Sequence, residues 1–343
     1  MDKLRKNCEK TRFGIEIETC VHVLDHKTKI EKFADEIESL VMYYDCLRTK
    51  SPVVWEMSKD ANYVPTSYDK WRVQPDDSLG CSVGPSRERD LSCVYNGATQ
   101  RLSDCDKLDF FPVEIITPVL TVPRGLKEFT MVWYSTILAN NFVYTVNDSQ
   151  GLHINISHPD VDARRFLYWW RAFEPIILQI LPDLRRKSGI QFAVPLTHKS
   201  FKGQDLLEIV SEKYAKYVAI NLHNPETPGK MRLEVRVYQG SMNYFEIYYW
   251  TLFCIIFLNV SILGGDPPEF SQDRVDELFR FLLGAVVDDG TQRFLLGKYR
   301  VNKNEDWPEV NYAPSNVNLL GEPPWKFTEE EERFIYDAQI GSC

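Results

Sequence analysis

Four short segments that alternate apolar and polar residues constrain this chain more than any other feature. Every second residue is apolar in RFGIEIE (12–18), GLHINIS (151–157) and MRLEVRV (231–237), and FPVEII (111–116) holds Glu114 inside an apolar run. Successive side chains of a β-strand point to opposite faces, so this period predicts four strands. Helical segments lie between them without the regular strand-helix alternation of a parallel sheet. The pattern therefore predicts a mixed α+β architecture.

The polar positions of these strands carry residues that can bind metal ions and phosphate. They are Glu16, Glu18, Glu114, His153, Asn155, Ser157, Arg232, Glu234 and Arg236. For any single strand, a face turned to water explains such residues, because antiparallel sheets commonly have one solvated face. If the strands are neighbours, the glutamates converge and repel one another. Divalent cations relieve such repulsion, and carboxylates with an imidazole suit Mg²⁺ or Mn²⁺. Arg236 would then face phosphate oxygens. Periodicity does not show which strands are adjacent, so both interpretations stay open.

Helical periodicity covers six further segments: 29–44, 124–140, 160–181, 203–217, 243–263 and 271–287. The fifth carries no charge from Ile247 to Leu263. This run is close to the about 20 apolar residues that span a membrane. However, it contains Asn259 and is followed by GGDPP, a sequence that ends helices. We predict a buried helix on which a sheet packs, and no membrane span.

The chain is long and apolar enough to form a large core without staples. Its 343 residues are 44% hydrophobic, and no low-complexity tract or repeat divides them. We expect one principal domain over residues 1–300. A stretch rich in Ser, Asp, Gly and Arg, at about 80–107, is predicted to be an insertion loop, and residues 301–343 a peripheral extension.

Charge and cysteine usage argue against other protein classes. The net charge of −9 disfavours a protein that wraps nucleic acid, which needs clustered Lys and Arg. The 8 cysteines form no CxxC pair, so we expect scattered, reduced thiols rather than a zinc site. MDKLRKNCEK at the N-terminus has no apolar core of a signal peptide, which predicts a cytoplasmic protein. His158, His198 and His223 show no pattern that gives them a partner.

Short motifs follow one another in a particular order along the chain. They are FGIEIE (13–18), WRVQPDDSL (71–79), VEIITP (113–118), SQGLHIN (149–155), KYVAIN (216–221) and LEVRVYQGS (233–241). In this order they resemble the G-x-E-x-E, W…D-x-S, G-x-H-x-H and E-x-R…G-[ST] strands of the amidoligase family, in the glutamine synthetase and carboxylate-amine ligase superfamily. The resemblance covers about residues 12–245. It implies a curved, mostly antiparallel sheet with a polar catalytic face and with helices packed on the other face.

The resemblance also implies ligands for two metal ions. Glu18, Glu114 and one further carboxylate resemble the ligands of one ion. Glu16, His153 and Glu234 resemble the ligands of the other.

The remaining matched positions resemble residues that handle phosphate and substrates. Arg236 resembles a phosphate-binding arginine, and Asp76 the acidic residue that receives the amine and takes its proton. In LPDLRRKSG, either Arg185 or Arg186 resembles the arginine that contacts phosphate and the substrate carboxylate; we assign Arg185 to catalysis and Arg186 to the nucleotide. Asn155 departs from the family, which has a second histidine there; its amide still donates to phosphate but carries no charge.

The implied activity is ATP-dependent ligation of a carboxylate and an amine, with Mg²⁺ or Mn²⁺, through an acyl-phosphate intermediate. Small-molecule or peptide acids and amines would be the substrates, and the product an amide or isopeptide. A guanidino-kinase-like phosphotransferase is one alternative, and demand for an amine separates the two. A non-catalytic module that binds nucleotide and metal is the other alternative, which Asn155 favours. The sequence carries no signal for the oligomeric state.

Overall fold

The computed structural model describes residues 1–23, 55–57, 70–76, 79, 92–95, 98–100, 111–133, 142–146, 149–181, 193–211, 217–224, 231–267, 275–303 and 319. The strands are β1 (Arg12–Val23), β2 (Trp55–Met57), β3 (Trp71–Pro75), β4 (Ser92–Tyr95), β5 (Ala98–Gln100), β6 (Phe111–Ile116), β7 (Leu120–Thr121), β8 (Phe142–Val146), β9 (Gly151–Ser157), β10 (Ile220–His223) and β11 (Arg232–Gln239). The helices are α1 (Asp2–Cys8), α3 (Arg124–Val132), α4 (Ala163–Ile180), α6 (Leu206–Ser211), α7 (Tyr244–Leu263), α8 (Val275–Ala285) and α9 (Asp289–Lys303), with a 3₁₀ turn, η4, at Lys199–Phe201.

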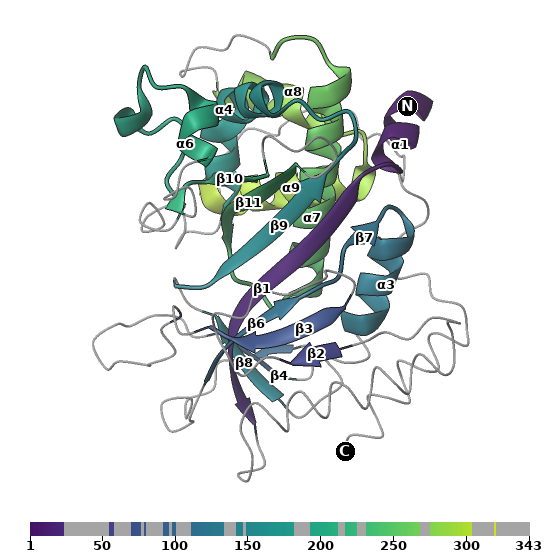
Figure 1. The fold of residues 1–343 in the computed structure, drawn as a ribbon, viewed down its shortest axis with the longest axis vertical. Coiled ribbons are helices and arrows are strands. Elements are labelled where there is room, and N and C mark those ends of the chain that lie inside the picture. Colours follow the sequence, from purple (N-terminus) through teal and green to yellow (C-terminus); the bar gives the residue numbers. More distant parts are fainter. Residues whose placement is uncertain are drawn as a thin grey trace.

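These strands form one sheet, with the order β10-β11-β9-β1-β6-β3-β2 (Figure 1). β7 and β8 also pair with β1, and β4 pairs with both β8 and β5. Among the strands described, every pair is antiparallel except β2 with β3. β1 is long enough to pair with four strands along its length, and it thereby joins segments that are distant in sequence. The predicted α+β fold with a mostly antiparallel sheet is confirmed.

The segment expected to be an insertion loop, at 80–107, contains two strands, so the expectation of a loop without strands is corrected there. β4 and β5 pair with each other, and β4 extends the sheet by pairing with β8. The sequence of this segment has weak periodicity. The backbone groups of β8 pair with β4, and β4 in turn pairs with β5. The other residues of the insertion lie outside the described part of the chain. Of the 301–343 extension, the structure describes residues 301–303 and Leu319. Leu319 is buried and donates its backbone N–H to Asp288.

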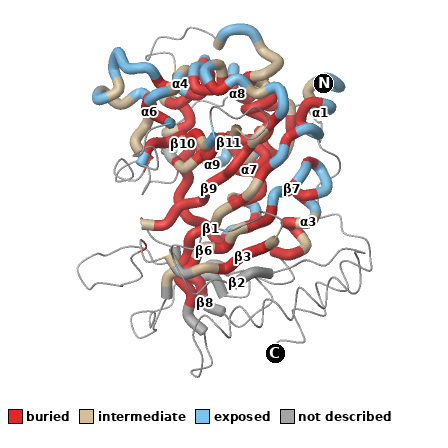
Figure 2. Tube along the Cα trace, in the orientation of Figure 1, coloured by how far each residue is buried: buried red, intermediate tan, exposed pale blue. Residues whose placement is uncertain are grey.

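The apolar face of the sheet packs on helices, as the alternation predicts. Ile15, Ile154 and Val235 are each fully buried, and the strands carrying them form the red band of Figure 2. α7 runs behind this face and contacts β9, α1, α3, α4 and α9. Burying each such aliphatic side chain contributes about 1.5–3 kcal/mol, so this layer carries much of the stability.

The predicted buried helix is confirmed in α7. Its length and mean hydropathy of 1.6 would suit a membrane span, yet 72% of that stretch is buried inside the protein. Asn243 caps its first turn through hydrogen bonds from the backbone N–H groups of Phe245 and Glu246, and it ends before Gly264. The predicted helices at 124–140, 160–181, 203–217 and 271–287 correspond to α3, α4, α6 and α8, with shorter described bounds. The one at 29–44 lies outside the described residues.

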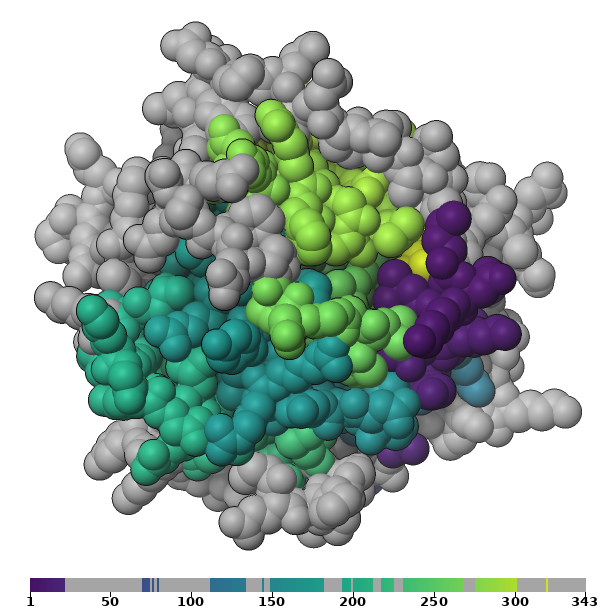
Figure 3. All heavy atoms as spheres, turned by 90° about the horizontal axis from the view of Figure 1, so that it is seen from above, coloured from purple at the N-terminus to yellow at the C-terminus, as the bar shows by residue number. Residues whose placement is uncertain are grey.

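A buried polar network ties the N-terminal helix to α7. Asn259 of α7 accepts from Asn7 Nδ2 at 2.8 Å and donates to Thr11 Oγ1 at 2.8 Å. His158 Nε2 lies 3.2 Å from the carbonyl of Asn7, and its Nδ1 accepts from the backbone of Asp160. His158 thus has partners that no pattern in the sequence indicates. Seen from above, the N-terminal residues (purple) lie beside the green and yellow-green residues of the C-terminal helices (Figure 3).

Cysteine states differ in part from the expectation of reduced thiols. Cys8 and Cys254 are free and buried. Cys20 of β1 is disulfide-bonded, so it departs from the expected pattern. Its Sγ also accepts a hydrogen bond from Gln150 Nε2 at 2.9 Å.

Candidate active site

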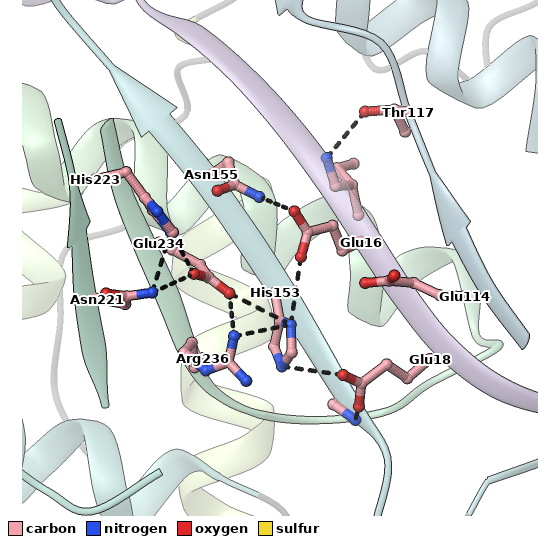
Figure 4. A network of polar contacts seen from close by, with 12 residues as sticks. Glu16, Glu18, Glu114, Thr117, His153, Asn155, Asn221, His223, Glu234 and Arg236 are labelled. Carbon is pink, nitrogen blue, oxygen red and sulfur yellow. Dashed lines mark hydrogen bonds and ion pairs between the residues drawn. The ribbon is translucent and has the colours of Figure 1, made fainter. Parts of the chain in front are cut away.

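Polar side chains from neighbouring strands converge on the face of the sheet opposite the helices (Figure 4). Register pairs Glu16 with His153 across β1 and β9, and Glu18 with Glu114 across β1 and β6. Glu234 of β11 pairs with Asn155 of β9, the residue next but one after His153. The adjacency that periodicity left open is thus present, and all the predicted metal ligands that are named by residue meet at one place.

Burial separates this face from an ordinary solvated one. Glu18 is 8% exposed, His153 4%, Asn155 6% and Glu234 4%. Burying charged groups is costly unless they are paired or coordinate a metal ion. A water-facing surface therefore does not explain these residues.

Two groups of side chains have the spacing of cation sites. One consists of Glu16, His153 and Glu234, and the other of Glu18, Glu114 and His153; in each group the ligand atoms lie within 4.8 Å of one another. His153 stands between them: its Nδ1 is 3.5 Å from carboxylate oxygens of both Glu16 and Glu234, and its Nε2 is 3.6 Å from Glu18. Carboxylates and an imidazole form a donor set suited to Mg²⁺ or Mn²⁺.

The second group contains Glu18 and Glu114, as the resemblance implies, together with His153. The further carboxylate that the resemblance implies was not named by residue and stays a prediction. Asp76, which follows β3, acts electrostatically on both Glu18 and Glu114 and lies at this end of the face. Gln74 of β3 donates to Glu114 at 2.8 Å.

Burial and crowding both raise the pKa values of two carboxyl groups in the centre. Burial raises the pKa of Glu114 well above its ordinary value, and the charges of Glu16, Glu18 and Asp76 raise it further. Burial also raises the pKa of Glu18, although His153 opposes the effect. Desolvation, with repulsion among the carboxylates added to it, therefore disfavours the charged forms of these groups, and a bound cation would favour them.

Glu234 shows the opposite shift because cations surround it. Burial works to raise the pKa of Glu234, but the hydrogen bond with His223 and the charges of Arg236 and His153 outweigh burial and lower it. Arg236 bonds to Glu234 through Nη1. Asn155 Nδ2 donates to Glu16 at 2.7 Å.

Two polar atoms of this face have spare hydrogen-bonding capacity. Arg236 Nε and Asn155 Oδ1 are buried and find no hydrogen-bond partner in the described part of the chain. Buried polar atoms are normally satisfied, so such groups call for an explanation. A ligand on this face would supply a partner, and Arg236 Nε donates to anions.

A pocket opens at one end of the polar face, next to Glu16 of the first metal-competent group. Its lining includes Arg12, Gly14, Asn155 and Arg232, with residues 116–119 along one side. Gly14 contributes no side chain, which leaves room between β1 and the segment after β6. Two arginines and Glu16 thus line the same pocket, which adjoins the acidic centre.

Two residues that sequence reasoning missed hold Glu234 in place. Asn221 Nδ2 lies 2.9 Å and His223 Nε2 2.7 Å from Glu234 Oε2. His223 thus has a partner that the sequence analysis did not identify. Period-2 alternation in INLH (220–223) was the available signal. Ile220 and Leu222 are buried, and the alternate residues Asn221 and His223 share the polar face. Arg185, Arg186 and positions 77–78 lie outside the described residues, so their predicted placement stays a prediction.

A comparison with family models adds an independent observation. The model described as "Putative amidoligase enzyme" matches residues 9–258, which include β1, β6, β9, β11 and most of α7. The chain belongs to this amidoligase family. No curated protein matches the sequence.

Two solved structures are similar to this amidoligase over 99% of its chain. One is the complex between the prokaryotic ubiquitin-like protein Pup and its ligase PafA, with 11% identity and a TM-score of 0.39. The other is a bifunctional glutathione synthetase from Pasteurella multocida, with 12% identity and a TM-score of 0.38. The chain spans 66% and 52% of the lengths of these two proteins.

Proposed function

We propose that this amidoligase uses ATP and a divalent cation to join a carboxylate to an amine through an acyl phosphate. The observation that carries the proposal is the buried polar face, where Glu16, Glu18, Glu114 and Glu234 surround His153. The carboxylates of this face repel one another, and they attract divalent cations together with the phosphates that such cations bind. The acid and the amine would be small molecules or peptides.

The residues present fit a divalent cation. Glu16, His153 and Glu234 would hold one ion, and Glu18, Glu114 and His153 would surround the other position. Bound there, the ions would neutralise a triphosphate and so ease attack on its terminal phosphorus.

Charge on the polar face suggests where the nucleotide, the amine and the acid lie. The pocket with Arg12 and Arg232 suits the anionic nucleotide because both side chains are positively charged. These arginines lie two residues outward from Gly14 and Glu234, about 7 Å along each strand. Asp76 lies at the opposite end, beside Glu18 and Glu114, where it would attract a protonated amine. The acid would bind between them, next to Arg236.

The chain's own groups would act in two steps. A carboxylate oxygen of the substrate attacks the γ-phosphorus and ADP leaves, while Arg236 donates to the phosphate oxygens that gain charge. Asp76 takes one proton from the ammonium group, the free amine nitrogen then attacks the acyl carbon, and the phosphate leaves with the second proton as the amide forms. The site is buried, which limits hydrolysis of the acyl phosphate.

Hydroxylamine trapping tests the proposal before the natural amine is identified. The protein is incubated with ATP, Mg²⁺, a panel of carboxylic acids and hydroxylamine, and both ADP and hydroxamate are measured. Hydroxamate requires an activated acyl group, so its formation together with ADP would support the ligase. Glu16→Ala and Glu234→Ala should abolish both products, whereas Glu208→Ala, at an exposed glutamate of α6, should change neither.

Two other outcomes would contradict the proposal. ADP with a phosphorylated guanidino compound, and no hydroxamate with any acid, would indicate a phosphotransferase. Tight, metal-dependent ATP binding without ADP release would indicate the non-catalytic module that Asn155 favours.

A further inference from the structure

The two carboxylate oxygens of Glu234 have separate sets of partners. Oε1 bonds to Arg236 and lies 3.5 Å from His153 Nδ1, so it faces the interior of the polar cluster. Oε2 faces the outermost strand of this part of the sheet, where Asn221 and His223 contact it at 2.9 and 2.7 Å. Figure 4 shows the carboxylate between these two groups.

Strand register places Asn221 and His223 of β10 beside this carboxylate. Asn221 pairs directly with Glu234, and His223 pairs with Arg232, on the antiparallel ladder of β10 and β11. The intervening Leu222 is buried on the other face. The sheet therefore holds two side-chain donors against one oxygen of Glu234, independently of any ligand.

The chemistry of the contact determines which nitrogen of His223 carries hydrogen. A carboxylate only accepts hydrogen bonds, so a contact of 2.7 Å requires His223 Nε2 to donate. Asn221 donates to the same oxygen through Nδ2. Oε2 is thereby occupied, and only Oε1 remains for a cation.

His223 itself stands outside the cation positions. The metal-competent groups found in the described part of the chain contain Glu16, His153 and Glu234, or Glu18, Glu114 and His153, and neither contains His223. Its side chain is 32% exposed, whereas that of Glu234 is 5% exposed. His223 thus touches a ligand residue from the outer side.

Such an outer contact matters because a glutamate carboxylate is torsionally free. Its terminal torsion has a broad energy well, so without partners at Oε2 the group could turn and offer either oxygen or both. Outer-shell hydrogen bonds commonly orient metal ligands, and their loss costs about 10–100-fold in metal affinity.

We propose that His223 and Asn221 are positioning residues that hold Glu234 as a one-oxygen ligand, through Oε1, for the cation shared with Glu16 and His153. This inference rests on the proposed function, since it assumes a cation at that position. It assigns a role to β10, which the sequence motifs leave without one.

Mn²⁺ binding tests the inference without turnover. Free Mn²⁺ is measured by its electron paramagnetic resonance signal during titration of the full chain without nucleotide. His223→Leu removes the donor, whereas His223→Gln retains an N–H that can reach Oε2. We expect His223→Leu to weaken binding about 10–100-fold, and His223→Gln to stay close to wild type. His198→Leu is the matched control, because His198 contacts Ser200 and no described residue of the cluster.

The results distinguish failure of the positioning role from failure of the cation site itself. Wild-type binding with unchanged affinity in His223→Leu would overturn the positioning role and leave the proposed function standing. Equal losses in His223→Leu and His223→Gln would also overturn it, because the imidazole itself would then be required. Absence of Mn²⁺ binding by the folded wild-type chain would overturn the cation site of the proposed function, and the positioning role with it. Thermal melting of every variant shows whether it is folded.

Discussion

Alanine substitution at two glycines should have opposite effects on stability, and the packing around each glycine gives the reason. A Cβ built on Gly14 lies 3.7 Å from Thr117 Oγ1 and 3.9 Å from Asn155 Cβ, which are ordinary contacts. A Cβ built on Gly240 lies 2.8 Å from Gln150 Cβ and 3.0 Å from the backbone oxygen of Glu18, which is too close. Neither glycine needs a left-handed backbone. Space alone therefore separates the two positions.

The magnitudes follow from these distances. Gly14→Ala removes the entropic cost of a glycine inside a strand and should stabilise the fold by about 0.5–1 kcal/mol. Gly240→Ala forces the chain after β11 away from β1, and overpacking of this kind costs about 1–3 kcal/mol. At about 2–4 °C per kcal/mol, the two variants should melt several degrees apart, on either side of the wild type.

The same Gly14→Ala change should harm nucleotide binding. Gly14 lines the pocket between Arg12, Asn155 and Arg232, so its new methyl group would occupy part of the space proposed for ATP. One extra methyl group in a filled pocket is worth about 10–200-fold. Calorimetric titration with a non-hydrolysable ATP analogue and Mg²⁺ measures this loss, and differential scanning calorimetry measures stability.

Two results would refute the reasoning separately. A stable Gly14→Ala variant that binds the analogue as tightly as wild type would show that the nucleotide does not use this pocket. A Gly14→Ala variant that is destabilised as much as Gly240→Ala would show that the packing around Gly14 is tighter than these distances indicate.

Three further changes test other parts of the structure. Glu114→Gln should raise the melting temperature of the metal-free protein, because it removes one of several crowded, buried carboxylates, and added Mn²⁺ should reduce the difference; a lower melting temperature without metal would contradict this. Burial lowers the pKa of His158, with Asp160 opposing and Lys10 assisting, so the unfolded chain binds more protons there and stability should fall as the pH drops below about 6.5. Melting curves at pH 7.5 and 5.5 should show a smaller fall for His158→Gln than for wild type. Asn259→Leu should cost about 1–3 kcal/mol for each partner left unsatisfied at Asn7 and Thr11, measured by urea denaturation, and a wild-type midpoint would refute the network.

Local pattern sufficed for the elements and for the direction in which their side chains point. Alternation predicted that Glu16 and Glu18 share a face opposite Ile15 and Ile17, and the structure buries those isoleucines. The uncharged run beginning at Ile247 became the buried helix α7. These features depend on the period of a strand or a helix, which is a property of neighbouring residues.

Motif order carried more than periodicity did. The resemblance named Glu114, His153 and Glu234 as metal ligands, although they are far apart in sequence, and the structure places Glu114 and Glu234 each in a group with His153. It did not reach His223, whose role depends on a register between β10 and β11 that no motif records. The two strands within 80–107 were missed for a similar reason, because β4 pairs with β8, which comes much later in the chain, and β5 pairs with β4.

The sequence by itself determined which residues are apolar, which are charged, and which of them alternate, and hence that the chain would form strands with one chemically distinctive face. Only the tertiary structure decided that this face is buried, that His153 stands between two groups of carboxylates, and that Oε2 of Glu234 is held from outside. The physical reason is that desolvation and charge interaction depend on distances between strands. Those distances are set by long-range pairing, whereas the alternation along each strand is set by the backbone alone.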